Sequence, residues 1–290
     1  EIVRQQLADP DINVLTGDAV AIGGEIAVNP TVRKVSFTGS TEVGRQLAAD
    51  CAPTLKRMSL ELGGNAPFMV FDDADLDKAL DLAMGSKFRN AGQTCICANR
   101  FLVQSGIHDR FVDGLAARVK ALRVGNGLDP DTDMGPLINA RAVERVDAMV
   151  RDAEAKGARL LVGGHRHALG GNFYEPTLLT GLKPDMRVFQ GEIFGPVAAV
   201  MPFVTEEEAV ALANDTSYGL ASYVCTRDLA RTWRLFGALQ YGMVGVNDAT
   251  LAAAETPFGG VKYSGLGREG SSEGLLEYME THYMLLGGLA

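Results

Sequence analysis

Short apolar runs alternate with helix-length amphipathic segments along most of this chain. Runs such as residues 32–37 and 243–246 have the length and the β-branched content of buried strands. Segments such as residues 108–122 and 140–156 carry apolar side chains at helical spacing. Parallel strands need crossover connections of this kind. The order therefore predicts an α/β fold in which helices cover a largely parallel sheet.

The expected elements follow this alternation to the end of the chain. Strands are expected at residues 32–37, 58–60, 68–71, 101–104, 159–162, 198–203, 221–226 and 243–246. Helices are expected at residues 40–51, after the acidic residues 72–75, and at 108–122, 140–156, 206–214 and 229–239. Residues 257–270 are too rich in glycine for either element, and residues 283–286 are expected to form a short apolar strand. Such a terminal strand often adds to a sheet of another subunit, so a homodimer or homotetramer is expected, with internal pairing as the alternative.

Charge and cysteine content exclude several classes of protein. The formal net charge is −9, which disfavours nucleic acid and anionic membrane surfaces as partners because both attract basic patches. No apolar run approaches the roughly 18 residues of a membrane span, and no basic-then-apolar leader is expected. Of the four cysteines only Cys95 and Cys97 lie close together, with no histidine beside them. Neither a disulfide framework nor a metal site is expected, and a reducing, cytoplasmic compartment is the simplest interpretation.

The first chemical motif is residues 88–97, FRNAGQTCIC. Gly92 and its small or polar neighbours end the preceding helix and leave Cys95 in a loop. A thiol there can be approached, and loop N–H groups can stabilise a thiolate or an oxyanion. A cysteine is more often a small core residue, as Cys51 and Cys225 are expected to be. The polar neighbours of Cys95 fit that alternative poorly, but its chemistry alone leaves both interpretations open.

The second motif, residues 60–65 (LELGGN), places Glu61 between two leucines at a strand end. Burial raises the pKa of a carboxyl toward neutrality, which suits a general base acting on water. The alternative is a salt bridge to Lys56 or Arg57. The two following glycines favour a functional role, because they let a second segment or a ligand approach closely.

Two further motifs are weak when each stands alone. In residues 37–44 (FTGSTEVG) a strand leads through Gly39 into a helix that Ser40 can cap, and such a helix N-terminus attracts phosphate. This motif is neither G-x-G-x-x-G nor a P-loop, and by itself an ordinary turn explains it better. In residues 190–196 (QGEIFGP), Glu192 could accept hydrogen bonds from ribose hydroxyls and Phe194 could pack on a flat ring. A surface carboxylate and a core side chain are the alternatives there.

Taken together and in this order, the motifs resemble the aldehyde dehydrogenase superfamily. The resemblance rests on residues 37–44, 60–65, 92–95, 192–196 and 257–260. It extends from about Asn13 to the C-terminus, whereas residues 1–12 match poorly. It implies part of a Rossmann-type nucleotide domain, an α/β catalytic domain and a C-terminal oligomerisation strand.

The resemblance implies a catalytic role for two residues. Cys95 would attack a small aldehyde as a thiolate and form a thiohemiacetal, and hydride transfer to NAD or NADP would then leave a thioester. Glu61 would activate the water that hydrolyses this thioester. A coenzyme A-acylating dehydrogenase is less consistent with the sequence, because Glu61 is present to supply water.

The resemblance also implies binding residues. The pyrophosphate would contact Gly39, Ser40 and Gly44, the nicotinamide ribose would bind Glu192, and the ring would lie beside Phe194. Asn247 would support the substrate mouth.

Within the superfamily, residues 86–100, 171–173 and 265–271 resemble the succinate-semialdehyde dehydrogenases. Arg89 matches an arginine that clamps the far carboxylate of the substrate, and a guanidinium recognises a carboxylate bidentately. A structural salt bridge is the alternative for Arg89. That group usually has a serine where this chain has Ala252, so one carboxylate contact is missing. Another semialdehyde, or a broader range of aldehydes, is therefore an alternative to succinate semialdehyde.

Cys97 suggests a regulatory hypothesis. It lies two residues after Cys95, and a reversible disulfide between the two thiols would stop catalysis under oxidation. The resemblance to the succinate-semialdehyde dehydrogenases implies such a switch, because some members of that group look to use a disulfide between these two positions in this way. A structural Cys97 is an equally good interpretation.

The resemblance divides the chain into residues 1–61, the C-terminal half of an NAD(P)-binding domain, residues 62–262, a catalytic domain, and residues 263–290, a C-terminal segment with the oligomerisation strand. The family's first nucleotide-binding half, its oxyanion asparagine and the lysine that contacts the adenosine ribose have no counterpart here. Little activity is therefore expected from this chain alone. A non-catalytic protein that keeps the fold is the alternative from another functional class. The choice between NAD and NADP stays open, because the segment that reads the adenosine 2′ position has no counterpart.

Overall fold

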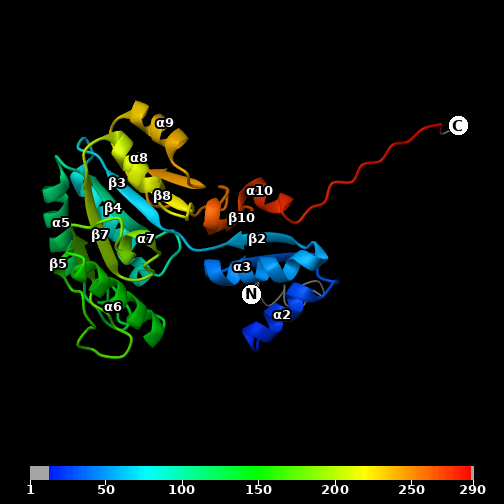
Figure 1. The fold of residues 1–290 in the computed structure, drawn as a ribbon, viewed down its shortest axis with the longest axis horizontal. Coiled ribbons are helices and arrows are strands. Elements are labelled where there is room, and N and C mark those ends of the chain that lie inside the picture. The colour runs from blue at the N-terminus through cyan, green and yellow to red at the C-terminus, as the bar shows by residue number, and fades with distance from the viewer. Residues whose placement is uncertain (1–12, 289–290) are drawn as a thin grey trace.

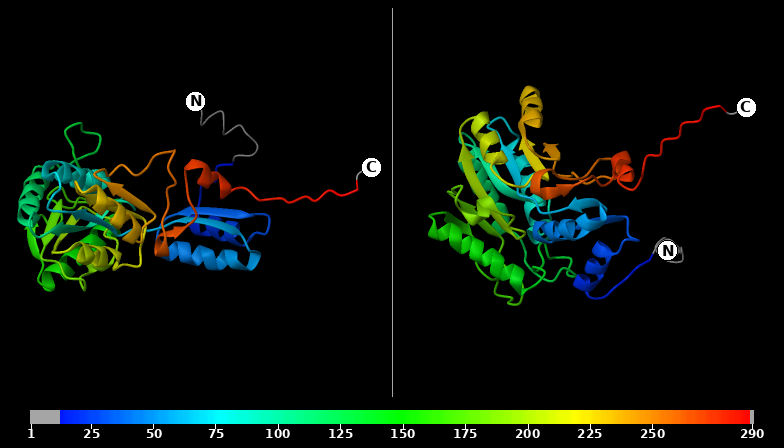
Figure 2. Two further views of the ribbon diagram at one scale, coloured as in Figure 1. Left: turned by 90° about the horizontal axis from the view of Figure 1, so that it is seen from above. Right: turned by 45° about the vertical axis from the view of Figure 1, so that its right-hand side comes forward.

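The computed structural model describes residues 13–288, and these form two lobes of unequal size. Figure 1 shows the larger lobe around one sheet and the smaller lobe around another, with the C-terminal tail leaving the smaller lobe. The views in Figure 2 show the same division from two other directions. Among residues 13–288, no helix combines the length and the apolar content needed to cross a membrane.

The larger lobe is built on a seven-stranded sheet in the order β5-β6-β7-β4-β3-β8-β9. Every neighbouring pair is parallel except β5 and β6 at one edge. The predicted α/β fold with a largely parallel sheet is confirmed. The strands are β3 (Ala66–Val70), β4 (Ala98–Gln104), β5 (Arg159–Val162), β6 (Thr177–Thr180), β7 (Val197–Phe203), β8 (Ala221–Cys225) and β9 (Met243–Val246).

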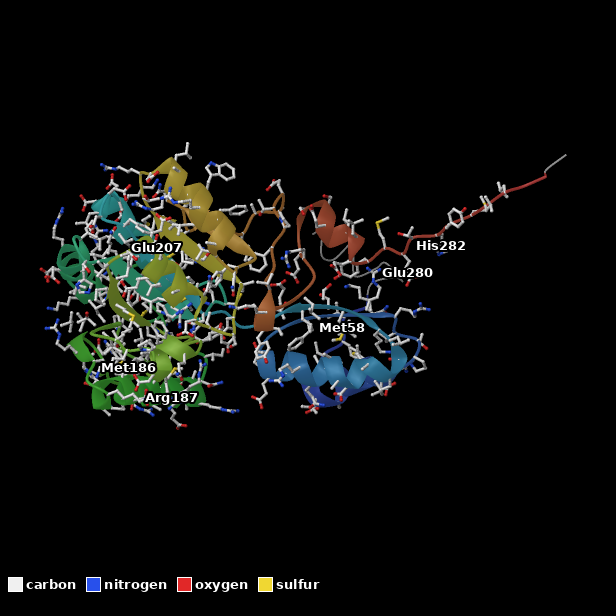
Figure 3. The ribbon with its side chains drawn as sticks, turned by 45° about the horizontal axis from the view of Figure 1, so that its top comes forward. Met58, Met186, Arg187, Glu207, Glu280 and His282 are labelled. Atoms are coloured by element: carbon white, nitrogen blue, oxygen red, sulfur yellow. The ribbon has the colours of Figure 1, made fainter. Side chains whose placement is uncertain are left out.

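Helices cover both faces of this sheet and supply the crossovers between parallel strands. Side-chain oxygens cap the N-termini of some of these helices: the Asp75 carboxylate, as the sequence indicated, accepts the N–H of Lys78, and Asn139 accepts that of Ala142. The helices are α4 (Leu76–Phe88), α5 (His108–Lys120), α6 (Ala140–Ala155), α7 (Arg187–Gln190), α8 (Glu206–Asn214) and α9 (Leu229–Ala238). Figure 3 shows how densely side chains fill this lobe, where Met186 and Arg187 mark α7. The short elements β6 and α7 were not expected from the sequence.

The smaller lobe contains a three-stranded sheet in the order β1-β2-β10. Strand β1 runs parallel to β2, and β10 pairs antiparallel with the end of β2, where Gly265 faces Glu61. Its elements are α2 (Ala19–Val28), β1 (Lys34–Thr38), α3 (Thr41–Cys51), β2 (Arg57–Glu61), β10 (Gly265–Leu266) and α10 (Ser271–Leu276). Helix α2, like α10, was not expected from the sequence.

The expectation that residues 257–270 hold neither helix nor strand is wrong. This segment contains a 3-10 turn (Lys262–Ser264) followed by β10. Glycine permits the strand here rather than preventing it. Gly265 has φ +130°, and a Cβ at this position would lie closer than 3.0 Å to the carbonyl oxygen of Leu60. Only a residue without a side chain can approach β2 so closely.

Residues 283–286 do not form the expected strand. Beyond α10 the described chain extends away from both lobes (Figure 1), and Figure 3 marks its start with Glu280 and His282. Tyr283 and Leu285 are 85% and 80% exposed. A strand requires a hydrogen-bonded neighbour, and none lies beside this segment within residues 13–288. The expectation about residues 1–12, and with it part of the first expected domain, lies outside the described residues.

Candidate active site

A cavity of about 550 Å³ lies where the two lobes meet, and it gathers most of the predicted functional residues. The smaller lobe contributes the turn before α3 and the end of β2. The larger lobe contributes the loop of Cys95, one side chain of α6 and the loop after α7. Its lining consists of Thr38, Gly39, Ser40, Glu61, Leu62, Gly63, Gln93, Thr94, Cys95, Arg145, Glu192 and Phe194.

The loop of Cys95 begins with a left-handed turn. Asn90, Ala91 and Gly92, which follow α4, have φ values of +55°, +53° and +71°. Left-handed backbone costs free energy for any residue except glycine, so tertiary contacts must hold it. One of them is at Gly92, where a Cβ would lie closer than 3.0 Å to the carbonyl oxygen of Gly195. The turn reverses the chain after α4 and carries Cys95 to the cavity wall.

The Cys95 thiol is partly buried. Burial, followed by the nearby carboxyls of Glu192 and Glu61, raises the pKa of Cys95 to about 11. The neutral thiol therefore predominates at pH 7, and a base must accept its proton before the sulfur can act as a nucleophile. The two carboxyls in the same cavity are the available bases.

Glu61 ends β2 with a buried carboxyl that forms no ion pair among residues 13–288. Its Oε2 atom makes no hydrogen bond within the described chain. Burial, followed by the charge of Glu269, raises the pKa of Glu61 to about 8, while Arg268 acts in the opposite direction. The alternative of a salt bridge is wrong, because the Lys56 ammonium binds the carbonyls of Asn29 and Val32, and Arg57 binds carbonyls near the C-terminus.

The segment after Glu61 contacts both other catalytic loops through glycines. A Cβ on Gly64 would lie closer than 3.0 Å to the carbonyl oxygen of Cys95, and one on Gly63 would lie 2.7 Å from Glu192 Oε2. The Gly64 N–H donates to Glu192 Oε1 at 3.0 Å. Burial raises the pKa of Glu192 to about 7, and this hydrogen bond opposes the shift. The prediction that the glycines admit a second segment is confirmed.

The turn of Gly39 and Ser40 faces the cavity at the N-terminus of α3. The Ser40 hydroxyl accepts the N–H of Val43 at 3.3 Å, so it caps the helix as expected. The Gly39 N–H donates to the Glu61 carbonyl at 3.0 Å, which joins this turn to β2. Gly44 does not line the cavity. A Cβ there would collide with the Leu62 side chain, so the absence of a side chain at Gly44 permits helix packing.

Arg89 lies outside this cavity, in a second cavity of about 270 Å³ on another side of the Cys95 loop. Thr94 lines both cavities, and Cys97, Tyr223 and Ala252 line the second. Arg89 is exposed and forms no ion pair among residues 13–288. The alternative of a structural salt bridge is therefore not observed within the described chain, and the guanidinium is available to a ligand.

Asn247 does not lie where a substrate contact was expected. It lines a separate cavity of about 180 Å³ that contains neither Cys95 nor Arg89. Its amide is used within the protein: Oδ1 accepts the Thr226 N–H at 3.1 Å, and Nδ2 donates to the Thr226 carbonyl at 2.8 Å. These bonds connect the end of β9 to the end of β8. The arrangement supports a structural position for Asn247.

Cys97 is buried and faces a lysine rather than Cys95. All four cysteines are free thiols. Lys87, at the end of α4, is fully buried, and its ammonium lies 3.2 Å from Cys97 Sγ. Tyr223 fixes the intervening residue by donating its hydroxyl to the Ile96 carbonyl at 2.6 Å. A disulfide with Cys95 would require Cys97 to leave Lys87.

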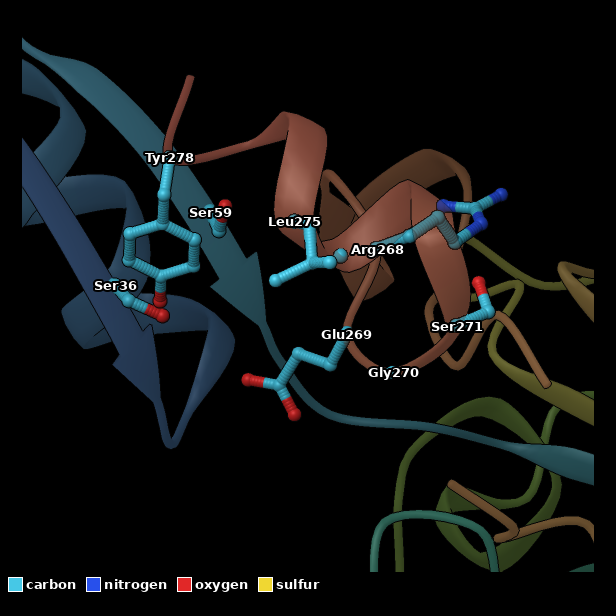
Figure 4. Close-up of a pocket in the computed structure, with 9 residues that line it drawn as sticks. Ser36, Ser59, Arg268, Glu269, Gly270, Ser271, Leu275 and Tyr278 are labelled. Atoms are coloured by element: carbon cyan, nitrogen blue, oxygen red, sulfur yellow. The ribbon is translucent and has the colours of Figure 1, made fainter. Parts of the chain in front are cut away.

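A third cavity, of about 290 Å³, lies between the smaller sheet and α10 (Figure 4). Tyr278 and Leu275 reach over Ser36 and Ser59 of the sheet, and Glu269 lies at its side. The neighbouring Arg268 guanidinium donates to the carbonyls of Gly260 and Gly267 at 2.9 and 2.7 Å. The loop before α10 thus brings a carboxylate and a guanidinium into the electrostatic environment of Glu61.

Sequence interpretation missed two residues that organise the site. Asn99 on β4 donates to Asn65 Oδ1 at 2.6 Å and to the Gly191 carbonyl at 2.9 Å, while its Oδ1 accepts the Ile193 N–H. It therefore joins the Glu61 segment to the Glu192 loop. The only signal for it was a polar amide at the start of an apolar strand. Arg145 of α6 also lines the cavity, but on an amphipathic helix it resembles a solvent-facing cation.

The cavity fits the reactive half of a dinucleotide. It presents the N-terminus of a helix, a carboxyl for hydroxyl groups and one aromatic side chain in the same cavity as the thiol. Among residues 13–288, no group of three or more His, Cys, Asp or Glu side chains could hold a metal ion.

Comparison with known proteins gives a consistent result over nearly the whole chain. A model described as "Aldehyde dehydrogenase family" matches residues 2–284, so the match begins well before Asn13 and the expected poor fit of residues 1–12 is wrong. Glutarate-semialdehyde dehydrogenase of Pseudomonas aeruginosa is 54% identical over 96% of this chain and 57% of its own length. The mitochondrial succinate-semialdehyde dehydrogenase of Oryza sativa is 52% identical over 96% of this chain and 53% of its own.

Solved structures agree with this result. An E. coli NADP-dependent enzyme has a TM-score of 0.94 at 53% identity, covering 95% of this chain and 57% of its own. The succinate-semialdehyde dehydrogenase of Burkholderia pseudomallei has a TM-score of 0.93 at 55% identity, covering 96% of this chain and 58% of its own. The chain thus spans little more than half the length of these relatives.

Proposed function

The chain belongs to the aldehyde dehydrogenase family, and from this premise we propose that it forms the catalytic core of an NAD(P)-dependent enzyme that oxidises a small semialdehyde to its carboxylic acid. The observation that carries the proposal is the meeting of Cys95, Glu61 and Glu192 in one cavity beside the N-terminus of α3. Succinate semialdehyde is the first candidate substrate.

Cys95 starts the reaction by attacking the aldehyde carbon. Its thiol proton passes to a carboxylate of the cavity, the bond from Sγ to carbon forms, and the carbonyl oxygen becomes the oxyanion of a thiohemiacetal. The backbone N–H of Cys95 and its loop neighbours stabilise that oxyanion. A nicotinamide held by this cavity would supply the chemistry that no side chain offers, because it would accept the hydride from the thiohemiacetal carbon. A thioester on Cys95 remains.

Glu61 completes the reaction by deprotonating water. The hydroxide attacks the thioester carbon and the bond from carbon to sulfur breaks. The carboxylic acid leaves, and the Cys95 sulfur takes the proton that Glu61 accepted from water. A carboxyl with a pKa of about 8 is a stronger base than an ordinary glutamate once ionised. This role for Glu61 disfavours transfer of the acyl group to coenzyme A.

The cofactor is NAD or NADP. Its pyrophosphate would bind the N–H groups near Gly39 and Ser40, its nicotinamide ribose would bind Glu192, and its ring would lie beside Phe194. Gly44 would serve indirectly, by letting α3 pack on Leu62. Both cofactors occur among similar proteins: the E. coli enzyme is named as NADP-dependent, and a betaine aldehyde dehydrogenase of Staphylococcus aureus, 40% identical, was solved with NAD+.

Arg89 would bind the far carboxylate of the semialdehyde. Its guanidinium is free of ion pairs within the described chain and lies in the cavity that shares Thr94 with the Cys95 site. Similar proteins are named as dehydrogenases of glutarate semialdehyde, succinate semialdehyde and 3-sulfolactaldehyde. Because Ala252 lines the same cavity and offers no hydroxyl, a longer semialdehyde or a broader range of aldehydes is the alternative.

Assembly and domain division are part of the same proposal. Residues 1–61 would form the second half of an NAD(P)-binding domain, residues 62–262 the catalytic domain, and residues 263–290 a C-terminal segment. The exposed apolar tail at Tyr283–Leu286 would pair with another subunit in a homodimer or homotetramer. A cytoplasmic location fits four free thiols.

Two assays test the proposal, one that depends on the nucleophile alone and one that also requires the cofactor. Release of nitrophenol from a nitrophenyl ester measures acylation of Cys95 without any nucleotide. Formation of reduced nicotinamide from succinate or glutarate semialdehyde measures the full reaction. We expect Cys95→Ala to abolish every activity that the wild-type chain shows in these two assays, and Cys51→Ala, in the smaller lobe, to preserve it. Ester turnover without dehydrogenase activity would indicate a catalytic core that needs residues beyond this chain. The absence of both activities would support the alternative of a non-catalytic protein that keeps the fold.

A further inference from the structure

The Cys95 loop ends in a tight turn. The Cys97 N–H donates to the Thr94 carbonyl at 3.1 Å, so Cys95 and Ile96 occupy the two central positions of a β-turn. The first peptide group after Cys95 is held sterically, because a Cβ on Gly64 would lie closer than 3.0 Å to the Cys95 carbonyl oxygen. The carbonyl of the next peptide group, that of Ile96, needs a partner of its own if the turn is to keep one conformation.

Tyr223 provides this partner from the sheet of the larger lobe. It lies on β8, is 1% exposed, and donates its hydroxyl to the Ile96 carbonyl at 2.6 Å. Its ring centroid lies 5.8 Å from that of Phe68 on one neighbouring strand, and a Cβ on Gly245 of the other would lie 3.2 Å from its Cδ1 atom. Burial raises the pKa of Tyr223, so the hydroxyl keeps its proton. The Ile96 carbonyl is therefore bound to a donor with little freedom to move.

The turn directs backbone N–H groups at the nucleophile. Burial raises the pKa of Cys95, and the N–H groups of Cys95 and Ile96 lie close enough to the sulfur to oppose that rise. In a planar trans peptide the carbonyl and the N–H point in opposite directions, so the Ile96 N–H points away from Gly64. During attack on a carbonyl carbon the negative charge passes from Sγ to the carbonyl oxygen. Fixed N–H donors beside the sulfur stabilise the charge at its new position without reorganising.

We propose that Tyr223 is a positioning residue for the nucleophile. By holding the Ile96 carbonyl, its hydroxyl fixes the turn so that the N–H groups of Cys95 and Ile96 face the sulfur and the oxyanion that forms beside it. The proposal rests on the function proposed above, because it needs Cys95 as the nucleophile. The hydroxyl acts through the backbone of the turn rather than on the substrate.

A purely structural role for the hydroxyl predicts a different result. If it only stabilised the fold around the loop, its removal would loosen Cys95 and change every reaction of the thiol by a similar factor. Acylation by a nitrophenyl ester passes through an oxyanion, whereas alkylation by iodoacetamide expels iodide and forms no oxyanion. The rates of these two reactions in one variant therefore separate the two roles.

The experiment measures both rate constants at one pH for the wild-type chain, Tyr223→Phe and Tyr174→Phe. Nitrophenol release reports acylation, and mass spectrometry reports alkylation at Cys95. Tyr174 is the matched control, because it is also 1% exposed, donates its hydroxyl to Asp147 at 3.1 Å and lines none of the cavities described here. We expect Tyr223→Phe to slow acylation by about tenfold or more, as for a displaced oxyanion donor, and alkylation by about threefold or less. Tyr174→Phe should keep both wild-type rates.

Two kinds of outcome would overturn the inference. If Tyr223→Phe changes both rates by the same factor, or changes neither, Tyr223 does not position the N–H groups, while the proposed nucleophile still stands. If the wild-type chain releases no nitrophenol, or Cys95→Ala still releases it, the proposed nucleophile itself fails, and this role of Tyr223 fails with it. Circular dichroism of each variant checks that the fold is retained.

Discussion

Gly64 touches the backbone of Cys95: a Cβ atom at Gly64 would lie closer than 3.0 Å to the Cys95 carbonyl oxygen. The same relation joins Gly92 to the carbonyl of Gly195. Three segments that are distant in sequence therefore meet backbone to backbone, and their side chains converge on one cavity. The position of the nucleophile depends on residues whose main property is the absence of a side chain.

Gly64→Ala should displace the Cys95 loop. The added methyl group meets a backbone atom that cannot rotate away, so we expect a loss of about 1–3 kcal/mol in the free energy of unfolding and a loss of most ester turnover. Urea denaturation and the nitrophenyl ester assay measure these effects. Gly237→Ala is the matched control, because nothing lies within 4 Å of its Cβ position in α9. It should raise stability by up to about 1 kcal/mol, and an equal loss in both variants would contradict the contact.

Glu61→Gln should stop the reaction at the thioester. Glutamine cannot accept a proton from water, so the acyl group remains on Cys95 and turnover falls by about 100-fold or more. Mass spectrometry of the intact chain after mixing with the nitrophenyl ester should show the acyl adduct. Glu255→Gln, an exposed carboxyl on the loop before β10, should turn over normally. An unmodified Cys95 in the Glu61 variant would argue against this order of steps.

Hydrolysis of the thioester should accelerate as pH rises through about 8, because Glu61 must be ionised to act as a base. Glu269→Gln removes a negative charge that raises this pKa, so the profile should shift to lower pH. The stability of the folded state depends on pH in the opposite direction. The raised pKa favours the folded state at low pH, and this contribution is lost between the ordinary value of 4.5 and about 8. Above pH 8, Glu61→Gln should therefore be more stable than wild type in thermal unfolding.

Arg89→Met should discriminate between charged and neutral aldehydes. Loss of a bidentate carboxylate contact should raise KM for succinate semialdehyde by about 10- to 100-fold, while an uncharged aldehyde of similar length is unaffected. Steady-state kinetics with both substrates, on a form that shows dehydrogenase activity, give the comparison. Arg110→Met is the control, since Arg110 is exposed on α5 and lines none of the cavities described here. Equal changes with both aldehydes would remove Arg89 from substrate recognition.

Oxidation tests the hypothesis about Cys97. Burial raises the pKa of Cys97, and the Lys87 ammonium, 3.2 Å from its Sγ, opposes that rise and so favours the thiolate that must attack an oxidised Cys95. Lys87→Met should therefore slow formation of the disulfide in peroxide by about threefold or more. Dithiothreitol should restore the activity of wild type and of Lys87→Met. In Cys97→Ala the disulfide cannot form, and recovery should fail as Cys95 oxidises further. If peroxide inactivates Cys97→Ala reversibly and at the wild-type rate, the disulfide plays no part.

Local pattern was sufficient for most elements of the larger lobe. The runs that became β8 and β9 and the amphipathic segment that became α6 were recognisable because burial and helical spacing leave periodic signals. The pattern failed where long-range contacts decide the outcome. The segment that includes β10 was expected to be irregular because of its glycines, and Gly265 pairs with β2 for the same reason. Residues 283–286 look like a strand but have no neighbour to pair with in the described chain.

The residues that bear chemistry are recognisable from local sequence: a thiol after a helix-ending glycine, a carboxyl between leucines, and a glutamate followed by an aromatic residue. The partners of each residue follow from the folded chain. The fold brought Glu61, Cys95 and Glu192 into one cavity, and added Arg145 from a helix that looked solvent-facing. In the folded chain the Asn247 amide forms hydrogen bonds with the Thr226 backbone, and the Lys87 ammonium donates to Cys97 Sγ. Periodicity reports only local backbone structure, whereas burial, charge and close approach depend on segments far apart in the chain.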